Sequence, residues 1–150
     1  MAANNYNKLI SISNEDLTKF NLGENSYEVN FIMDSGDVEL GDLIFDLGSE
    51  LSLYGQGIPE PLILIKSFPI KKTDVKVMGR NLDTLKIVKN GVSYMKFFAK
   101  NLIEEINRCD TEEIEVTIIG KAHVNEWNGT LSPQIKISEI EVRPYRNLSF

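Results

Sequence analysis

The stretch HVNEWNGTLSPQIKISEI, residues 123–140, carries a strand pattern on each side of Asn128-Gly129. Asn-Gly between alternating apolar residues is the strongest short-range signal for a hairpin with a two-residue turn. We therefore expect a hairpin whose strands cover residues 113–127 and 131–142. The one tryptophan of the chain, Trp127, lies at the tip. Two roles are open for it: it packs back over its own turn and shields the core, or it offers a platform for a stacked ligand.

The elements before this hairpin predict a mostly β (α+β) domain. A second Asn-Gly pair, Asn90-Gly91, predicts a turn between strands over 76–89 and 92–98. A further strand covers 62–68, and helical spacing of apolar residues predicts a short helix over 99–108. Three strands, a helix and two more strands is the element order of the five-stranded OB-fold barrel, although a generic five-stranded α+β sheet has the same order.

The first part of the chain differs from the rest in charge. Residues 1–61 hold eleven acidic and two basic residues, whereas residues 62–150 hold eleven acidic and fourteen basic residues. In the first part we expect a short helix that stops at Gly23, a strand over 27–34 and a helix over 38–53. Two glycines and two prolines just before residue 62 break regular structure. We therefore expect an acidic N-terminal strand-helix appendage, residues 1–61, leading into an OB domain, residues 62–150.

Composition excludes several classes of protein. The single Cys109 among 150 residues leaves no disulfide framework. No basic head followed by an apolar run stands at the N-terminus, as a secretory signal would require. The longest apolar run, residues 62–65, is far shorter than a bilayer span. We therefore expect a cytoplasmic protein without a membrane partner. The basic excess after residue 61 permits a basic surface on a chain whose net charge is −6.

Two motifs carry a resemblance to a known family. YGQGIPEP, residues 54–61, followed by an apolar strand, resembles the PFGxGNPxPxF sequence that leads into the C-terminal OB domain of RecJ, the single-strand-specific 5′→3′ DNA exonuclease. VNEWNG, residues 124–129, followed by QIKISEI, residues 134–140, resembles the NEWNG hairpin of that domain. The resemblance is most specific at Asn125 to Gly129 and extends over about residues 27 to 142.

Weaker matches and departures accompany these motifs. LKI at 85–87 and MKFF at 95–98 stand where the family has its LKL and aFn strands. Tyr54 replaces the usual Phe of the family, and Ile58 replaces its Asn. These departures leave the fold unaffected and indicate a divergent branch, bacterial or from a phage or other mobile element.

The resemblance also implies what this chain lacks. RecJ enzymes are similar to other phosphoesterases in which Asp and His clusters, including Asp-His-His, hold two Mn²⁺ or Mg²⁺ ions. Two-metal hydrolysis needs several such ligands around ions about 4 Å apart. This chain has one histidine, His123, and no Asp-His-His. We therefore expect no catalytic residue, metal or cofactor here, with Mn²⁺ or Mg²⁺ confined to a catalytic core that the chain does not contain.

For an OB domain, the expected ligand surface is the face of the second and third strands together with two of its loops. If Leu85, Ile87, Met95 and Phe97 point inward, alternation sends their neighbours outward. Outward lysines would meet phosphates, and an outward ring would stack on a base. The candidate nucleic-acid-binding residues are therefore Lys76, Arg80, Lys86, Tyr94, Lys96, Trp127, Asn128 and Lys136.

Plainer interpretations of these residues remain open. Lysines on a strand also form an ordinary solvated face that discourages aggregation, and Tyr94 can equally pack beneath the N-terminal helix. The resemblance favours a non-catalytic module that binds single-stranded DNA and positions it for an exonuclease core in DNA repair or recombination. Its further partners would be a nuclease core or a single-strand-binding protein. The alternative is a protein-interaction module in such a complex, and the missing ligands disfavour an enzyme in its own right.

Overall fold

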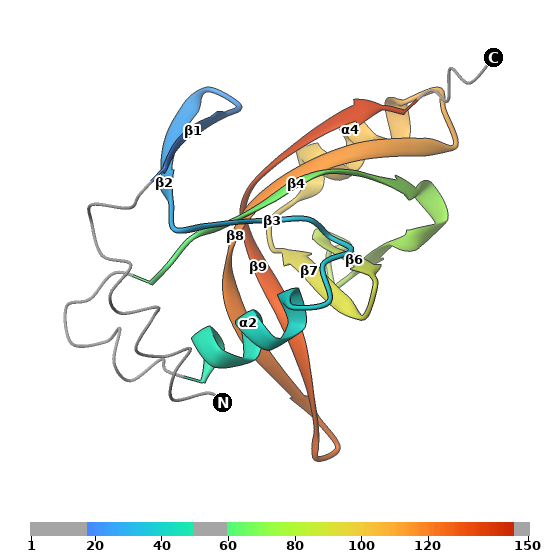
Figure 1. The fold of residues 1–150 in the computed structure, drawn as a ribbon. Coiled ribbons are helices and arrows are strands. Elements are labelled where there is room, and N and C mark those ends of the chain that lie inside the picture. The colour runs from blue at the N-terminus through green and yellow to red at the C-terminus, as the bar shows by residue number, and fades with distance from the viewer. Residues whose placement is uncertain (1–17, 50–59, 146–150) are drawn as a thin grey trace.

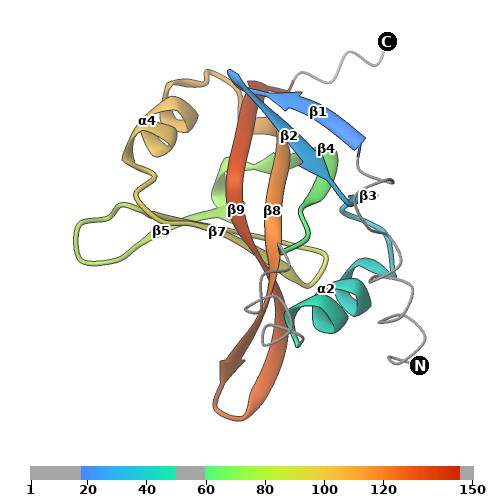
Figure 2. The same cartoon turned by 90° about the vertical axis from the view of Figure 1, so that its left-hand side faces the viewer.

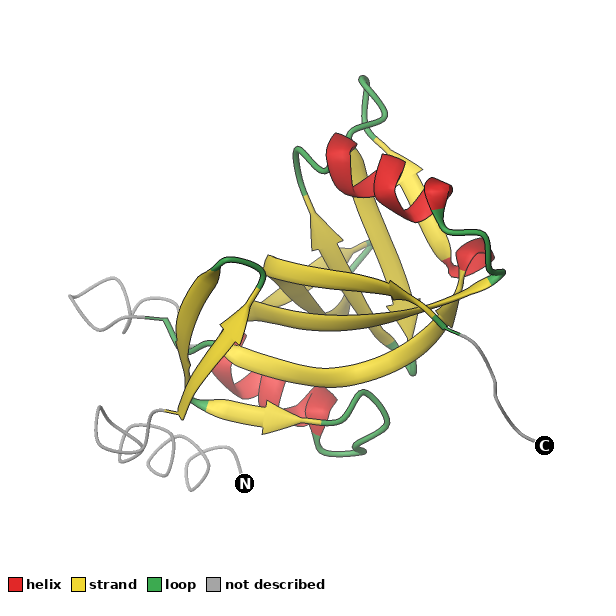
Figure 3. Ribbon diagram, turned by 90° about the horizontal axis from the view of Figure 1, so that it is seen from above, coloured by secondary structure: helices red, strands yellow, loops and turns green. Residues whose placement is uncertain are grey.

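The computed structural model describes residues 18–49 and 60–145, which form a strongly curved sheet, a separate hairpin and two α-helices (Figures 1 and 3). The elements in chain order are β1 (Thr18–Leu22), β2 (Asn25–Val29), β3 (Phe31–Met33), α2 (Leu40–Gly48), β4 (Ile63–Lys71), the 3₁₀ turn η2 (Lys72–Asp74), β5 (Val75–Met78), β6 (Thr84–Lys89), β7 (Val92–Lys96), α4 (Lys100–Arg108), β8 (Glu113–Trp127) and β9 (Thr130–Pro144). The mostly β prediction is confirmed.

The main sheet has the strand order β3-β4-β8-β9-β7-β6-β5. Neighbouring strands are antiparallel except for β3 with β4 and β7 with β9. In the strand order β4 and β5 lie far apart, yet only the three residues of η2 separate them in sequence. The sheet must therefore curl until its two ends approach, as Figure 3 shows. This arrangement is OB-like.

The described sheet is open and has seven strands, which differs from the predicted five-stranded barrel. One extra strand arises because the predicted strand over 76–89 is divided by a turn at Gly79, which adopts φ +93°. The other is β3, which pairs in parallel with β4. Backbone with positive φ leaves the extended conformation, so the pairing of one long strand ends there.

Both predicted Asn-Gly turns are confirmed. Asn90 and Gly91 have φ of +51° and +80°, and Asn128 and Gly129 have φ of +50° and +78°. Two consecutive residues at positive φ are the requirement of the type I′ turn, whose twist matches that of paired strands. The longer hairpin pairs β8 with β9 from Ile114 to Trp127 and extends below the body of the molecule (Figure 1).

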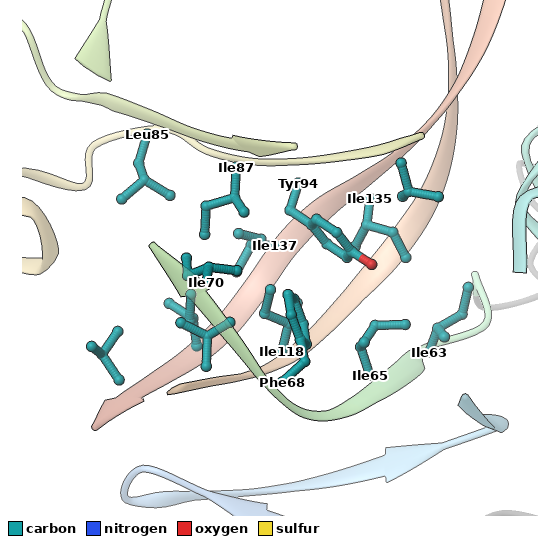
Figure 4. Close-up of a cluster of buried hydrophobic side chains, with 14 of the residues drawn as sticks. Ile63, Ile65, Phe68, Ile70, Leu85, Ile87, Tyr94, Ile118, Ile135 and Ile137 are labelled. Carbon is teal, nitrogen blue, oxygen red and sulfur yellow. The ribbon is translucent and has the colours of Figure 1, made fainter. Parts of the chain in front are cut away.

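The core lies on the inner face of the curved sheet (Figure 4). Helix α2 contributes buried Leu40, Ile44 and Leu47 to it, and α4 contributes Leu102 and Ile106. The predicted helix over 38–53 is thus shorter, and residues 50–53 lie outside the described part of the chain. Since α2 shares the core with the later strands, the division between residues 1–61 and 62–150 is not a gap in packing; whether either part folds alone stays a prediction.

The β1–β2 hairpin covers part of the outer face of the sheet. Its Leu22 and Val29 pack against Leu64 of β4 and Ile119 of β8 in a second apolar cluster. The hydroxyl of Tyr27 donates to Glu139 at 2.9 Å. The predicted helix ending at Gly23 is therefore wrong for the described residues 18–22, because alternating apolar side chains there bury one face of a hairpin.

Tyr94 faces the core, which corrects the expectation that it lies on the surface. Its side chain is fully buried and its ring centroid lies 5.6 Å from that of Phe68 (Figure 4). The register explains this orientation: Tyr94 stands directly opposite Ile87, and directly paired residues share a face. A two-residue turn at Asn90-Gly91 already implies this pairing, so the phase of β7 was available from the sequence.

Burial leaves the Tyr94 hydroxyl without a hydrogen-bond partner among the described residues. An unsatisfied buried donor costs about 1–3 kcal/mol, so we expect Tyr94→Phe to stabilise the fold by about 1 kcal/mol and raise Tm by a few degrees. A lower Tm would mean that the hydroxyl has a partner.

Burial also raises the pKa of Tyr94 above its ordinary 10.0. The unfolded chain then ionises this tyrosine before the folded chain does. Stability is therefore unaffected by this group below pH 10 and falls above it, by up to about 1.4 kcal/mol per pH unit. In urea unfolding from pH 9 upward, the free energy of unfolding of Tyr94→Phe should fall less steeply with pH than that of the unchanged chain.

Candidate nucleic-acid interface

Four lysines lie in one row across five strands on the outer face of the sheet. Lys76 of β5 pairs with Lys86 of β6, Lys86 with Met95 of β7, Met95 with Lys136 of β9, and Lys136 with Lys121 of β8. We call these five residues the lysine row. Strands lie about 4.8 Å apart, so the row extends over about 19 Å. In Figure 2, β5 and β7 extend to the left from the place where they approach β9 and β8.

The row contains two pairs of like charges directly opposite each other. Lys76 faces Lys86, and Lys136 faces Lys121. Like charges in directly opposite positions destabilise a sheet. Local conflicts of this kind are expected where function requires them. Lys76, Lys121 and Lys136 are exposed and Lys86 is half-buried, so all four ammonium groups are placed to meet a polyanion.

The outer orientation of the row follows from the packing of the opposite face. Ile135 and Ile137 flank Lys136 on β9 and lie in the core, as Ala122 does beside Lys121. Alternation then sends both lysines outward. The core side of this part of the sheet is covered by α2, because a Cβ on Gly48 of that helix would lie 2.8 Å from Val124 Cγ2.

A polar cluster adjoins the row at its centre. The side-chain amide of buried Gln134 donates to Ser93 Oγ at 3.3 Å and to Met95 Sδ at 2.8 Å. These contacts anchor the Met95 side chain between the lysines. His123 lies directly opposite Gln134. Burial and the neighbouring Lys136 lower the pKa of His123, against a smaller opposing effect of Glu60. The imidazole is thus neutral at pH 7 and adds no charge to the row.

Trp127 and Asn128 lie at the tip of the β8–β9 hairpin, beyond the row. The Trp127 side chain is 74% exposed, which disagrees with the shielding role and leaves its ring accessible. Trp127 lies on the same outer face as Lys121, since both follow the alternation of β8. The tip therefore continues the face that carries the lysines.

The remaining candidates are divided between the two faces. Lys76, Lys86 and Lys136 belong to the row, and Arg80 is exposed on the loop between β5 and β6. Lys96 pairs with Leu85 and thus lies on the face of β7 opposite to Lys86, so its expected place beside Lys86 is wrong. The cause is the one-residue phase error on β7 that also misplaced Tyr94, because a shift by one residue exchanges the two faces of a strand.

Two residues of the interface were missed from the sequence. Lys121 stands opposite Lys136 in the β8–β9 hairpin, and Met95 stands between Lys86 of its own hairpin and Lys136 of β9. Lys121 had a usable signal, since the turn at Asn128-Gly129 implies a nearby partner on β9. Further from the turn, a bulge between Ile119 and Gly120 shifts the pairing register of the hairpin by one residue. Met95 also had a signal for its outward orientation, because the turn at Asn90-Gly91 pairs it with Lys86, whereas its parallel pairing with Lys136 is set only in the folded chain.

Other features of the described residues concern metals and membranes. In residues 18–49 and 60–145 no group of three or more His, Cys, Asp or Glu side chains is arranged to hold a metal ion. Within the same ranges no helix has both the length and the apolar character needed to cross a bilayer.

Comparison with known proteins identifies the family. The model of the RecJ OB domain matches residues 36–139. The chain is 27% identical over 133 residues to YorK of Bacillus subtilis (strain 168), whose name describes an SPbeta prophage-derived single-strand DNA-specific exonuclease. It has the same identity to the YorK protein of Bacillus phage SPbeta, and in both cases the match covers 87% of this chain and 23% of the relative.

Among solved structures, RecJ of Thermus thermophilus in complex with Mn²⁺ is 24% identical, with a TM-score of 0.46. That match covers 71% of this chain and 15% of the other. The chain thus spans about a quarter of the length of the curated relatives it matches. Since the family model matches more than half of the chain, the protein belongs to the RecJ OB domain family.

Proposed function

We propose that this chain is the single-stranded DNA-binding OB module of a RecJ-like 5′→3′ exonuclease. It holds the strand on the lysine row and positions it for a nuclease core that lies outside this chain. The module itself contributes no catalytic residue and no metal, and Mn²⁺ or Mg²⁺ belongs to that core. The proposal places the module in the cytoplasm and in DNA repair or recombination.

The observation that carries the proposal is the lysine row with its directly opposed like charges. A phosphate backbone relieves the repulsion within each pair, because each phosphate brings a negative charge and releases counterions on binding. Glu139 lies close to the row, opposite Ile119, and its carboxylate accepts a hydrogen bond from Tyr27 at 2.9 Å. Further along the outer face, Glu141 pairs with Arg143 at 2.7 Å, and Glu115 stands directly opposite Arg143. The basic surface is therefore local and the overall charge of −6 does not oppose it.

In this proposal the nuclease core lies outside this chain. The curated relatives, named as single-strand DNA-specific exonucleases, are about four times as long as the matched segment. Supplying substrate to a neighbouring active site needs a binding surface and no chemistry of its own. This role suits a domain whose described residues offer a basic face but no metal cluster.

A protein-docking role is the second candidate. It is favoured by Leu82 and Phe98, which are 64% and 89% exposed on the connections next to β6 and β7. Exposed apolar side chains of this size are common at docking surfaces. The two candidates differ in their dependence on salt.

Fluorescence anisotropy with labelled oligo-dT at 50 and 200 mM salt tests the proposal. Four phosphate contacts predict a slope of about −2.8 in log K against log salt for a single strand, or a loss of about 50-fold between these concentrations. A duplex of equal length is the control and should bind more weakly. Absence of binding, or binding that salt does not change, would contradict the proposal and favour protein docking.

A further inference from the structure

The lysine row has two different flanks on the outer face. On one flank Met78 pairs with Thr84, and Phe97 follows Met95 by two residues, directly after the last pair of the β6–β7 hairpin. Continued alternation places Phe97 on the face of Met95, and its exposure of 54% agrees with a position outside the core. The other flank consists of Val88, Ser93, Gln134 and His123.

These flanks offer different surfaces to a nucleobase. Phe97 presents an exposed ring, and the nearby Met78 is 37% exposed. On the opposite flank Gln134 is only 5% exposed and its amide is engaged by Ser93 and Met95. Val88, at 43% exposed, is an aliphatic side chain without a π-face. The imidazole of His123 on this flank is only partly exposed, and the accessible ring of Trp127 lies further along β8, about 20 Å from the row. Stacking needs an accessible aromatic face, and it tolerates every base because each base has one.

We propose that the bases of the bound strand lie on the Phe97 flank, with the phosphates over the lysine row and one base stacked on the Phe97 ring. This inference rests on the proposed function and adds to it the side of the row that the bases occupy. Phe97 takes the stacking role that the sequence assigned to Tyr94. The contact is to the π-face of a base, so the site reads no sequence at this position.

Two oligomers of equal length and charge separate base contacts from phosphate contacts: oligo-dT and an abasic oligomer with the same phosphate spacing. Phe97→Ala should weaken oligo-dT by about 5- to 150-fold, the range of one lost stacked base. The substitution should leave unchanged the affinity for the abasic oligomer and the slope of log K against log salt. Phe97→Tyr should retain binding. Val88→Ala is the matched control, because Val88 lies two residues from Lys86 on the other flank, and it should bind like the unchanged chain.

Each alternative outcome contradicts the inference in a recognisable way. If Phe97→Ala and the unchanged chain bind oligo-dT with equal affinity, no base stacks on Phe97 and the inference is wrong. The proposed function would then still stand. If Val88→Ala lowers the affinity for oligo-dT more than Phe97→Ala does, the bases lie on the other flank. If Phe97→Ala lowers the affinity for the abasic oligomer as much as the affinity for oligo-dT, the ring supports the fold and does not stack on a base. If the unchanged chain binds neither oligomer, the proposed function fails and this inference fails with it.

Discussion

Replacing Lys86 and Lys136 together by glutamate is expected to lower the affinity for oligo-dT by about 100- to 1,000-fold at low salt. Each lysine contributes about 1 kcal/mol of attraction to a phosphate near 4 Å in water, and each glutamate replaces it with a repulsion of similar size. Anisotropy titrations at several salt concentrations measure the effect. The slope should also fall, by about 0.7 for each lost contact.

The matched control for this experiment changes the charge equally but away from the row. Lys66 of β4 and Lys100 of α4 are both exposed and do not belong to the row. A Lys66→Glu/Lys100→Glu variant should lose less than about fivefold in affinity for oligo-dT, because exposed charges beyond a Debye length of about 10 Å are screened. The Lys86→Gln/Lys136→Gln variant removes the attraction without adding repulsion. Its affinity for oligo-dT should therefore lie between those of the unchanged chain and the glutamate variant of the row. Equal losses in the row variant and the control would mean that net charge, and not the row, determines binding.

Replacing Gly120 by alanine is expected to destabilise the fold by about 3 kcal/mol or more. A Cβ at this position would lie 2.5 Å from the carbonyl oxygen of Lys136 and 2.5 Å from Ile135 Cγ2. Overpacking of a core costs about 1–3 kcal/mol even where side chains can move, and here the nearest neighbour is also backbone. Relief requires separating β8 from β9, the strands that carry Lys121 and Lys136.

Thermal and urea unfolding measure this effect, and Gly36→Ala is the matched control. A Cβ on Gly36 would meet only Asn90 Nδ2, at an ordinary contact distance of 3.8 Å. Gly36→Ala should therefore change stability by about 0.5 kcal/mol or less. If Gly120→Ala unfolds at the same temperature as Gly36→Ala, the close approach of β8 and β9 at the bulge is less tight than the geometry states.

Local sequence determined the hairpins, the strand-rich class and the family of this protein. Asn-Gly pairs require positive φ at two consecutive residues, and alternation requires one buried face, so both signals act within a few residues of the chain. The β8 prediction over 113–127 agrees with the observed strand. The same local rules, applied strictly to the Asn90-Gly91 turn, place Tyr94 opposite Ile87, so that error lay in the interpretation and not in the sequence.

Tertiary structure alone decided how the lysines assemble. Lys76 and Lys86 meet within one short hairpin, but Lys121 and Lys136 join them only through the parallel pairing of β7 with β9, about forty residues apart in sequence. Nothing local specifies that pairing, because it depends on which curved sheet best buries Tyr94, Ile135 and Ile137 together. Packing of the inner face thus places the charges of the outer face, and a surface assembled from two separate hairpins cannot be predicted from either one alone.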